Sequence, residues 1–227
     1  MHAPGDPDPD DSAPPVYPLN ETRFHRMTLA AAGFLCTPWV DLELSGFDRL
    51  PREGAAVLVA NHTSEFDLLA LQLAIPRPLF SMQREEWFRD RARAALLRPL
   101  GVFPTASGGR NSWAFAHAAN LLRHGQLVCL FPEGTPSQGR GLKVARSDAA
   151  RLALIAGCPI LPVAIEGSAT IFHQPGRAHV RLKLCEIIQP RRNELALALT
   201  DRLMFDLARN LPPRLQGVYA QALSGFD

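Results

Sequence analysis

The sequence has only four cysteines, and none of them forms a pattern that binds a metal. Cys36, Cys129, Cys158 and Cys185 include no Cys-x-x-Cys pair, and no histidine lies at zinc-ligand spacing from them. Each lies among apolar residues, which is typical of a small buried side chain in a reducing compartment. We therefore expect neither a metal site nor a disulfide framework.

Long apolar runs and a strong net charge are also missing. The apolar stretch 27–40 is shorter than the about 20 residues that a membrane-spanning helix needs, and Pro38 interrupts it. The first residues show no basic start followed by an apolar run, so we expect no secretory signal. A formal net charge of +2 is too small to indicate nucleic-acid binding. With 47% hydrophobic and 20% charged residues, the composition is that of a globular domain.

The chain divides into four segments by composition. A Pro/Asp-rich tail has too little apolar surface to offset the entropy of ordering, so we expect it to be disordered. A helical stretch, a main domain and a C-terminal extension with a short helix follow. The predicted boundaries are 1–18, 19–39, 40–211 and 212–227.

The helical stretch 19–39 has basic residues next to an apolar run. Asn20 or Thr22 can cap it, and Arg23 and Arg26 precede its apolar residues. This pattern favours an amphipathic helix on a membrane surface. A helix packed on the core of the domain fits the pattern equally well.

The main domain alternates between strand and helix periodicity. Continuous apolar, β-branched runs such as 55–60 predict strands that are covered on both faces. Helices of about ten residues between them predict an α/β domain, with a layered, mixed, largely parallel sheet flanked by helices. The expected strands are 40–45, 55–60, 78–82, 102–105, 127–131, 160–165 and 180–188, and the expected helices are 66–74, 87–97, 113–123, 147–156 and 193–210, the last two capped by Ser147 and Asn193.

Three loops that follow strands contain polar groups suited to chemistry: 61–67, 104–111 and 131–141. Ligands of such sheets gather at the carboxyl ends of the strands. In the first loop, His62 follows a strand and Asp67 lies in the first turn of the next helix. The carboxylate can then accept from one ring nitrogen and leave the other free as a base. Alone, this spacing is more typical of a structural histidine.

The third loop changes that interpretation. Phe131-Pro132-Glu133-Gly134-Thr135 directly follows a buried strand and offers backbone N–H groups, a carboxylate and a hydroxyl to a polar ligand. An ordinary turn with a capping acid is the alternative.

Together these two blocks resemble the lysophospholipid (1-acylglycerol-3-phosphate) acyltransferase family, part of the glycerolipid acyltransferases. The matching residues are 59–67 and 131–135, with further similarity at 101–104 and 158–163, in the same order. The similarity runs from about residue 40 to 190 and implies that 40–211 is an acyltransferase domain.

The resemblance implies that His62 deprotonates the acceptor hydroxyl while Asp67 orients it. The hydroxyl oxygen then attacks the thioester of acyl-coenzyme A or acyl-carrier protein, which act as co-substrates, so no cofactor is expected. An acyl-Ser64 route is disfavoured because Ser64 lacks a Gly-x-Ser-x-Gly setting. The residues implied or considered for substrate binding are Asn61, Ser64, Arg110, Phe131, Pro132, Glu133, Gly134, Thr135 and Arg146.

The chain departs from the family at three positions where relatives often have a cation. Here they are occupied by Gln83, by the stretch 105–107 and by Pro136. Arg110 or Arg146 could substitute, whereas Lys143 is expected to be a solvated surface cation. Because these cations would neutralise a phosphate, we expect an acceptor with less phosphate charge than lysophosphatidic acid.

The helix 87–98 alternates arginines with apolar residues, which favours peripheral binding to a membrane, although a solvated helix face is the alternative. We expect a cytoplasmic protein on the inner face of the membrane, with a lipid acceptor and an acyl donor as partners and without nucleic acid. A non-catalytic lipid-binding relative, and a thioesterase that uses the same His–Asp pair, remain alternatives.

Overall fold

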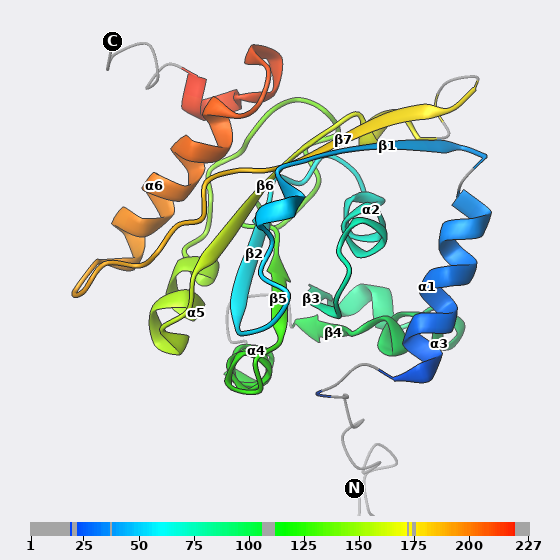
Figure 1. Ribbon diagram of the computed structural model, residues 1–227, viewed down its shortest axis with the longest axis horizontal. Helices are drawn as coiled ribbons and strands as arrows, with labels where there is room; N and C mark the ends of the chain where they lie inside the picture. Colours follow the sequence, from blue (N-terminus) through cyan, green and yellow to red (C-terminus); the bar gives the residue numbers. More distant parts are fainter. Residues whose placement is uncertain are drawn as a thin grey trace, which may run out of the picture.

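The computed structural model describes residues 19, 22–36, 38–105, 112–171, 173 and 176–220 of the chain. Within them, seven strands form one sheet in the order β1-β7-β6-β2-β5-β3-β4 (Figure 1). Neighbouring strands are parallel except β6 and β7, so the predicted α/β class with a mixed, largely parallel sheet is confirmed. The strands are β1 (Val40–Ser45), β2 (Ala56–Ala60), β3 (Leu79–Arg84), β4 (Val102–Thr105), β5 (Leu127–Leu130), β6 (Ile160–Glu166) and β7 (Ala178–Leu184).

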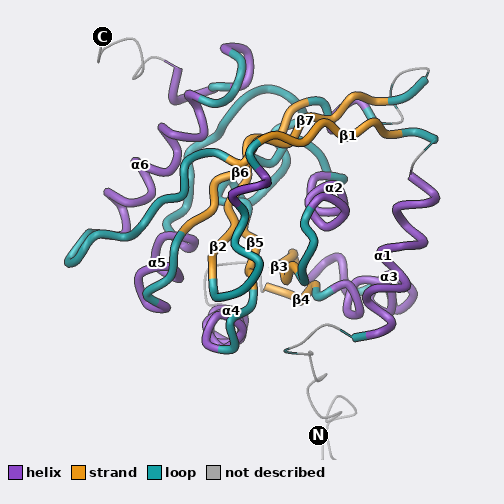
Figure 2. The backbone as a smooth tube through the Cα atoms, viewed as in Figure 1, coloured by secondary structure: helices purple, strands orange, loops and turns teal. Residues whose placement is uncertain are grey.

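Helices cover both faces of this sheet (Figure 2). One apolar core lies between the sheet and α4, α5 and α6, and the other lies between the sheet and α2, with apolar residues of α1 and α3 at its margin. The helices are α1 (Arg23–Cys36), α2 (Asp67–Ala74), α3 (Arg91–Leu97), α4 (Ser112–Arg123), α5 (Asp148–Ala156) and α6 (Ala196–Arg209), and the 3-10 turns are Phe47–Arg49, Glu85–Phe88, Arg98–Leu100, Ser168–Thr170, Pro213–Leu215 and Gly217–Tyr219.

Strand β2 lies at the centre of the sheet and is buried along its whole length. Val57 and Val59 point into the core under α4–α6, and Leu58 points into the core under α2. The apolar side chains therefore face both layers, because successive side chains of a strand alternate in direction. This strand ends at Ala60, two residues before His62, and so fixes the position of that residue.

Three element boundaries of the main domain differ from the predicted ones by more than two residues. The last strand ends at Leu184 rather than 188; beyond it, Ile188 makes only an isolated bridge to Ile160. The predicted helix 87–97 is a 3-10 turn followed by α3, because the Asp90 side chain accepts from the Arg93 N–H and starts a new helix there. Asn193 does not cap α6: it has a left-handed φ of 60°, and the helix begins three residues later. Ser147 precedes α5, but its side chain makes no cap hydrogen bond.

The first helix, α1, is capped by Thr22, one of the two residues predicted to cap it. Thr22 Oγ1 accepts from the His25 N–H at 3.0 Å, and the helix ends at Cys36, before Pro38. The helix contacts α2 and the 3-10 turn Arg98–Leu100. Most of its large apolar side chains are nevertheless exposed, and no helix in the described part of the chain is long and apolar enough to cross a membrane. The predicted disordered tail 1–18 lies outside the described residues.

Three of the four cysteines, Cys129, Cys158 and Cys185, are buried, and the fourth, Cys36, is half-buried. Burial raises the pKa of the Cys158 thiol to about 11 and that of Cys185 to about 12. These cysteines are therefore protonated, small apolar side chains, as their sequence context indicated.

The C-terminal segment forms two 3-10 turns that bind the loop after β5. Leu142 N–H donates to Leu215 O at 3.0 Å, and Leu142 O accepts from Val218 N–H at 3.1 Å. Gly217 has a φ of 54°, and a Cβ there would lie 2.0 Å from Leu142 O, so only glycine allows this close approach. The division of the chain at 211/212 stays a prediction, but residues 213–219 are built into the main body of the protein.

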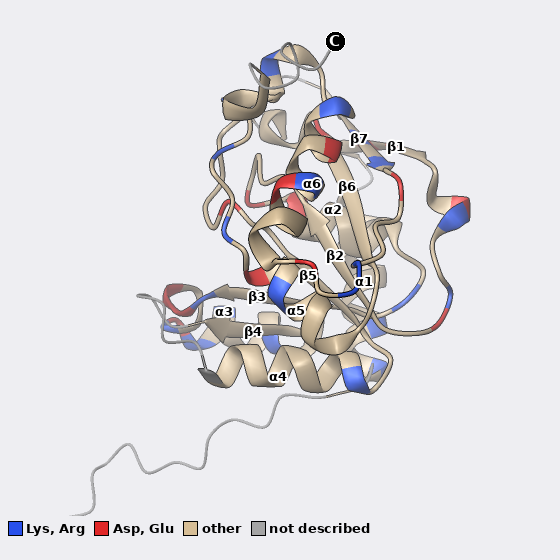
Figure 3. Cartoon of the chain, turned by 90° about the vertical axis from the view of Figure 1, so that its left-hand side faces the viewer, with Lys and Arg blue, Asp and Glu red and all other residues tan. Residues whose placement is uncertain are grey.

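Charges on the side of the molecule that presents α4, α5 and α6 are of both signs. Figure 3 shows Lys and Arg interspersed with Asp and Glu along the helices and loops of this side. This distribution fits the small net charge of the sequence.

Candidate active site

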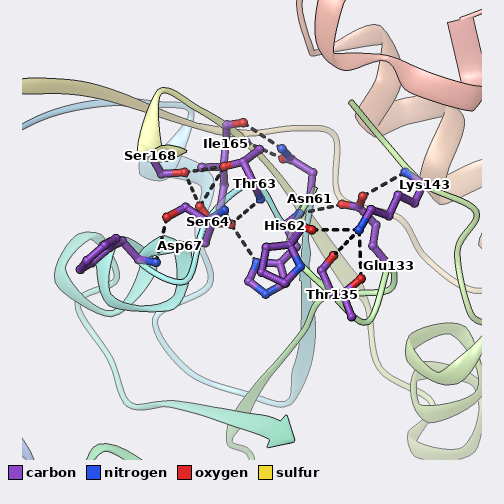
Figure 4. Close-up of polar contacts among 12 residues, drawn as sticks. Asn61, His62, Thr63, Ser64, Asp67, Glu133, Thr135, Lys143, Ile165 and Ser168 are labelled. Atoms are coloured by element: carbon purple, nitrogen blue, oxygen red, sulfur yellow. Dashed lines mark hydrogen bonds and ion pairs between the residues drawn. The ribbon is translucent and has the colours of Figure 1, made fainter. Parts of the chain in front are cut away.

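The site is built where three neighbouring strands end. Strands β6, β2 and β5 are adjacent and parallel, so the residues after them meet at one edge of the sheet. They supply Ser168, the loop 61–67 and the loop 131–141, respectively (Figure 4). The remaining predicted loop, 104–111, lies mostly outside the described residues, and Arg110 is among those not described.

The structure brings His62 and Asp67 together. His62 Nδ1 lies 2.9 Å from Asp67 Oδ2, and both side chains are buried. An ionised carboxylate only accepts hydrogen bonds, so Nδ1 must donate here and Nε2 is the nitrogen available for proton transfer. This is the arrangement that the spacing of the two residues predicted.

The Asp67 carboxylate is fully buried and surrounded by donors. Its Oδ2 also accepts from the main-chain N–H groups of Thr63 and Ser64, at 2.6 and 2.9 Å. Its Oδ1 accepts from Thr63 Oγ1 at 3.1 Å and from the Ser168 hydroxyl. Four hydrogen bonds therefore hold the carboxylate in addition to the one from His62.

Sequence reasoning missed Thr63 and Ser168 as parts of this site. Thr63 lies inside the recognised block 59–67, but no role was predicted for it. Ser168 follows β6, which was recognised as a strand, so the rule that sites gather at strand ends could have drawn attention to it.

Glu133 fixes the main chain of His62. Its Oε1 accepts from the His62 N–H at 2.7 Å, and its Oε2 accepts from the Lys143 N–H at 2.9 Å. Burial raises the pKa of the Glu133 carboxyl, and the two N–H donors oppose that rise. The His62 carbonyl accepts from the Ser137 N–H at 2.7 Å, so the loop after β5 holds both polar groups of the His62 main chain.

Two further residues of the recognised blocks contact protein groups. Phe131 stacks on the His62 ring, with centroids 4.2 Å apart and planes inclined by 20°. Asn61 joins β2 to β6: its Nδ2 donates to Ile165 O at 2.8 Å, and its Oδ1 accepts from the Ile165 N–H at 2.7 Å. Both residues were predicted to bind substrate, and in this structure they position the strand ends and the imidazole.

A model of the Acyltransferase family matches residues 41–166, more than half of the chain. This chain belongs to the acyltransferase family. The match contains His62, Asp67 and Glu133 and ends two residues before Ser168. The resemblance that the motifs indicated is therefore confirmed.

Proteins similar to this acyltransferase include 1-acyl-sn-glycerol-3-phosphate acyltransferases. That of Escherichia coli is 24% identical over 140 residues, which are 60% of this chain and 57% of the relative. That of Borreliella burgdorferi is 24% identical over 135 residues, 59% of this chain and 54% of the relative. An uncharacterized protein of Mycobacterium tuberculosis is 32% identical over 152 residues, 61% of this chain and 41% of the relative. The chain thus spans about half the length of the relatives it matches.

The fold is similar to that of the 1-acyl-sn-glycerophosphate (LPA) acyltransferase PlsC from Thermotoga maritima. The TM-score is 0.65 at 23% identity, and the match covers 82% of this chain and 76% of the other. This similarity agrees with the sheet order and helix layers described above.

The cations at Lys143 and Arg146, near the block 131–135, are bound by protein groups. The Lys143 ammonium donates to Thr135 Oγ1 at 3.0 Å, Thr135 O at 3.3 Å and Pro136 O at 2.8 Å. The expectation of a solvated surface cation at Lys143 is therefore wrong. The Arg146 side chain is exposed and pairs with Asp148 at 3.2 Å, while its main-chain N–H donates to Pro132 O.

The remaining predicted substrate-binding residues lie at the surface of the same loops. Gly134 and Thr135 are exposed, and Gly134 has a left-handed φ of 73° that favours glycine in this turn. Ser64 is half-buried, and its Oγ accepts from the Phe66 N–H at 3.2 Å. Substrate contacts by these residues stay predictions.

Removing the Glu133 carboxylate should loosen the loop that contains His62. In Glu133→Ala, the buried His62 N–H and the partly buried Lys143 N–H lose their acceptor, and an unsatisfied buried donor costs roughly 1–3 kcal/mol. We expect a lower free energy of unfolding in urea together with a lower kcat, whereas Glu65→Ala, at an exposed acid of the first loop, should change neither. Unchanged stability with only a raised KM for the acceptor would show that Glu133 binds the acceptor instead.

Proposed function

We propose that this protein transfers a fatty acyl group from a thioester donor to a hydroxyl of a lysophospholipid or a related polar lipid. The observation that supports this most directly is the buried His62–Asp67 pair, with Nδ1 hydrogen-bonded to the carboxylate, inside the region that matches the family. The relatives named for acyl transfer to 1-acyl-sn-glycerol-3-phosphate agree in reaction type.

In the proposed reaction, His62 Nε2 accepts the proton of the acceptor hydroxyl as its oxygen attacks the thioester carbonyl. A C–O bond forms, the C–S bond breaks, and the leaving thiolate recovers the proton from the imidazolium. Asp67 stabilises that imidazolium and fixes the ring. A general base of this kind is worth about 10²–10⁴ in rate.

The acceptor acts directly as the nucleophile in this proposal, without an acyl-enzyme. Ser64 Oγ is hydrogen-bonded to the Phe66 N–H, and its N–H donates to Asp67, so this residue supports the loop. The donor is either acyl-coenzyme A or acyl-carrier protein, bound as a co-substrate, and no further cofactor is proposed.

We further propose an acceptor whose headgroup has less phosphate charge than lysophosphatidic acid. Among the described cations near the site, the Lys143 ammonium is bound to the loop 135–136, and Arg146 is paired with Asp148. Arg84, at the end of β3, is paired with Glu86 at 3.3 Å. Each of these cations already has a protein partner, which weakens the case for a strong phosphomonoester site.

We also propose that α1 binds the inner face of the cytoplasmic membrane. Phe24, Met27, Phe34 and Leu35 are all more than half exposed, and their spacing places them in one stripe of the helix. Phe34 is 80% exposed. Such a stripe is typical of a helix that lies in the interface of a bilayer.

Basic residues near α1 also support the binding of this helix to a membrane. α1 contacts the 3-10 turn Arg98–Leu100, which directly follows α3, and Arg89, Arg91 and Arg93, in and before α3, are exposed. Exposed arginines next to an apolar stripe favour anionic lipids, with about 1 kcal/mol for each cation at the surface.

Substitution of the pair tests the reaction. We expect His62→Ala to lower kcat/KM by at least about 10²-fold and Asp67→Asn to lower it by a similar or smaller factor, because the base loses its proton-accepting nitrogen or its orientation. Transfer from radiolabelled acyl-coenzyme A to a panel of lyso-lipids is the measurement, and His124→Ala, an exposed histidine of the same chain, is the control. Free fatty acid released without any acceptor would instead identify a thioesterase, and binding without turnover would identify a lipid-binding relative.

The acceptor proposal predicts a preference between headgroups. A lyso-lipid with a phosphodiester headgroup should have a higher kcat/KM than lysophosphatidic acid, because the described cations near the site would have to exchange their protein partners to neutralise a second phosphate charge. Faster turnover of lysophosphatidic acid, abolished by Arg110→Ala, would overturn this and show that Arg110 replaces the missing cations.

Vesicle sedimentation tests the membrane proposal. The double variant Phe34→Ser/Leu35→Ser should lose most of its binding to vesicles of phosphatidylglycerol and phosphatidylcholine, because the apolar stripe is interrupted. Leu197→Ser, at an equally exposed leucine of α6, should bind like the wild type. Wild-type protein that stays entirely in the supernatant would contradict the proposal.

A further inference from the structure

Ser168 is a buried serine that lies against the Asp67 carboxylate. It has no exposed surface, and its hydroxyl donates to Asp67 Oδ1 and also contacts Thr63 Oγ1. It is separated from Asp67 by 101 residues and comes from the loop after β6, outside every motif that the sequence revealed. Figure 4 shows the Ser168 side chain directed at the carboxylate from the side opposite His62.

The fold places Ser168 there by two constraints. The Asn61 amide makes two hydrogen bonds to the Ile165 main chain, which fixes the end of β6 against the end of β2. Gly167 then turns the chain with a φ of 90°, where a Cβ would lie 2.0 Å from His179 O. A side chain at position 167 therefore cannot be accommodated, and the turn that delivers Ser168 requires glycine.

The group that accepts the hydrogen bond from the Ser168 hydroxyl distinguishes this residue from an ordinary core serine. Ser81 is equally buried, but its hydroxyl donates to main-chain oxygens, such as Cys129 O at 3.3 Å. The acceptor of Ser168 is a carboxylate, and hydrogen bonds to ionised groups are roughly twice as strong as neutral ones. A donor on Oδ1 fixes the rotation of the carboxylate, and that rotation decides whether Oδ2 faces His62 Nδ1.

We propose that Ser168 is a positioning residue for acyl transfer. It holds Asp67 so that Oδ2 accepts from His62 Nδ1, and it thereby keeps Nε2 as the basic nitrogen. Because the kinetic part of this inference rests on the proposed function, it is paired with a measurement that needs no turnover.

The kinetic test compares Ser168→Ala with Ser81→Ala. We expect Ser168→Ala to lower kcat roughly 10- to 100-fold, the value of a hydrogen bond to a charged group, with KM for donor and acceptor within about twofold. Thr63 Oγ1 still donates to Oδ1, so the loss should be smaller than in Asp67→Asn. Ser81→Ala, with the same chemical change in the same core, should keep wild-type kcat.

The second test measures the tautomer of the His62 ring directly. In protein with ¹⁵N-labelled histidine, the wild type should show His62 as the Nδ1–H tautomer, and Ser168→Ala should show mixed or exchanging tautomers. Ser168→Cys, a near-isosteric variant with a weak donor, should be intermediate and guards against a folding defect in the alanine variant. A single, unchanged Nδ1–H tautomer in Ser168→Ala would overturn the proposal, as would a kcat equal to that of Ser81→Ala. Loss of turnover in every protein with the expected tautomer shift would refute the proposed function alone.

Discussion

The burial of the Asp67 carboxylate is the constraint from which the rest of the site follows. A carboxylate without exposed surface is stable only when donors surround it, because the energy of removing a charge from water is large. Here the donors come from the loop that precedes Asp67 and from Ser168, in the 3-10 turn after β6. The loop 61–67 is therefore folded around its own acid, and the imidazole is one of five donors that the acid requires. The arrangement that satisfies the buried charge is also the one that the proposed general base requires.

Several residues of the recognised blocks make contacts that support the His62 loop within the protein. Glu133 holds the His62 main chain, Asn61 joins two strands, and Phe131 packs on the imidazole. Rigid support of this kind has a physical purpose, since a base misplaced by about 1 Å loses much of its effect. Among the predicted substrate-binding residues of the two blocks that the structure describes, Gly134 and Thr135 remain exposed, so they are where the proposed acceptor could make contact.

The sequence allowed the sheet, most helices and the His62–Asp67 contact to be predicted, because each depends on local pattern. The run 55–60 could only be a strand covered on both faces, and a histidine at its end is five residues from its acid. Predictions failed where a local signal competed with tertiary contacts: Asn193 adopts a left-handed turn instead of capping a helix. Ser168 could not be identified, because one serine 101 residues from its partner has no local pattern. The lysine at 143 was misjudged for the same reason, since its acceptors belong to a folded loop.

The close contact between Gly217 and Leu142 connects the end of the chain to the chemistry. Leu142 is the neighbour of Lys143, whose N–H is bound by Glu133, and Glu133 in turn holds His62. A continuous line of contacts thus runs from residues 215–218 through Leu142, Lys143 and the Glu133 carboxylate to the main-chain N–H of His62. The smallest fragment that keeps a properly formed site must then extend at least through the second 3-10 turn, well past the family match at 166. A fusion partner placed at the C-terminus would need a linker long enough to leave that turn undisturbed.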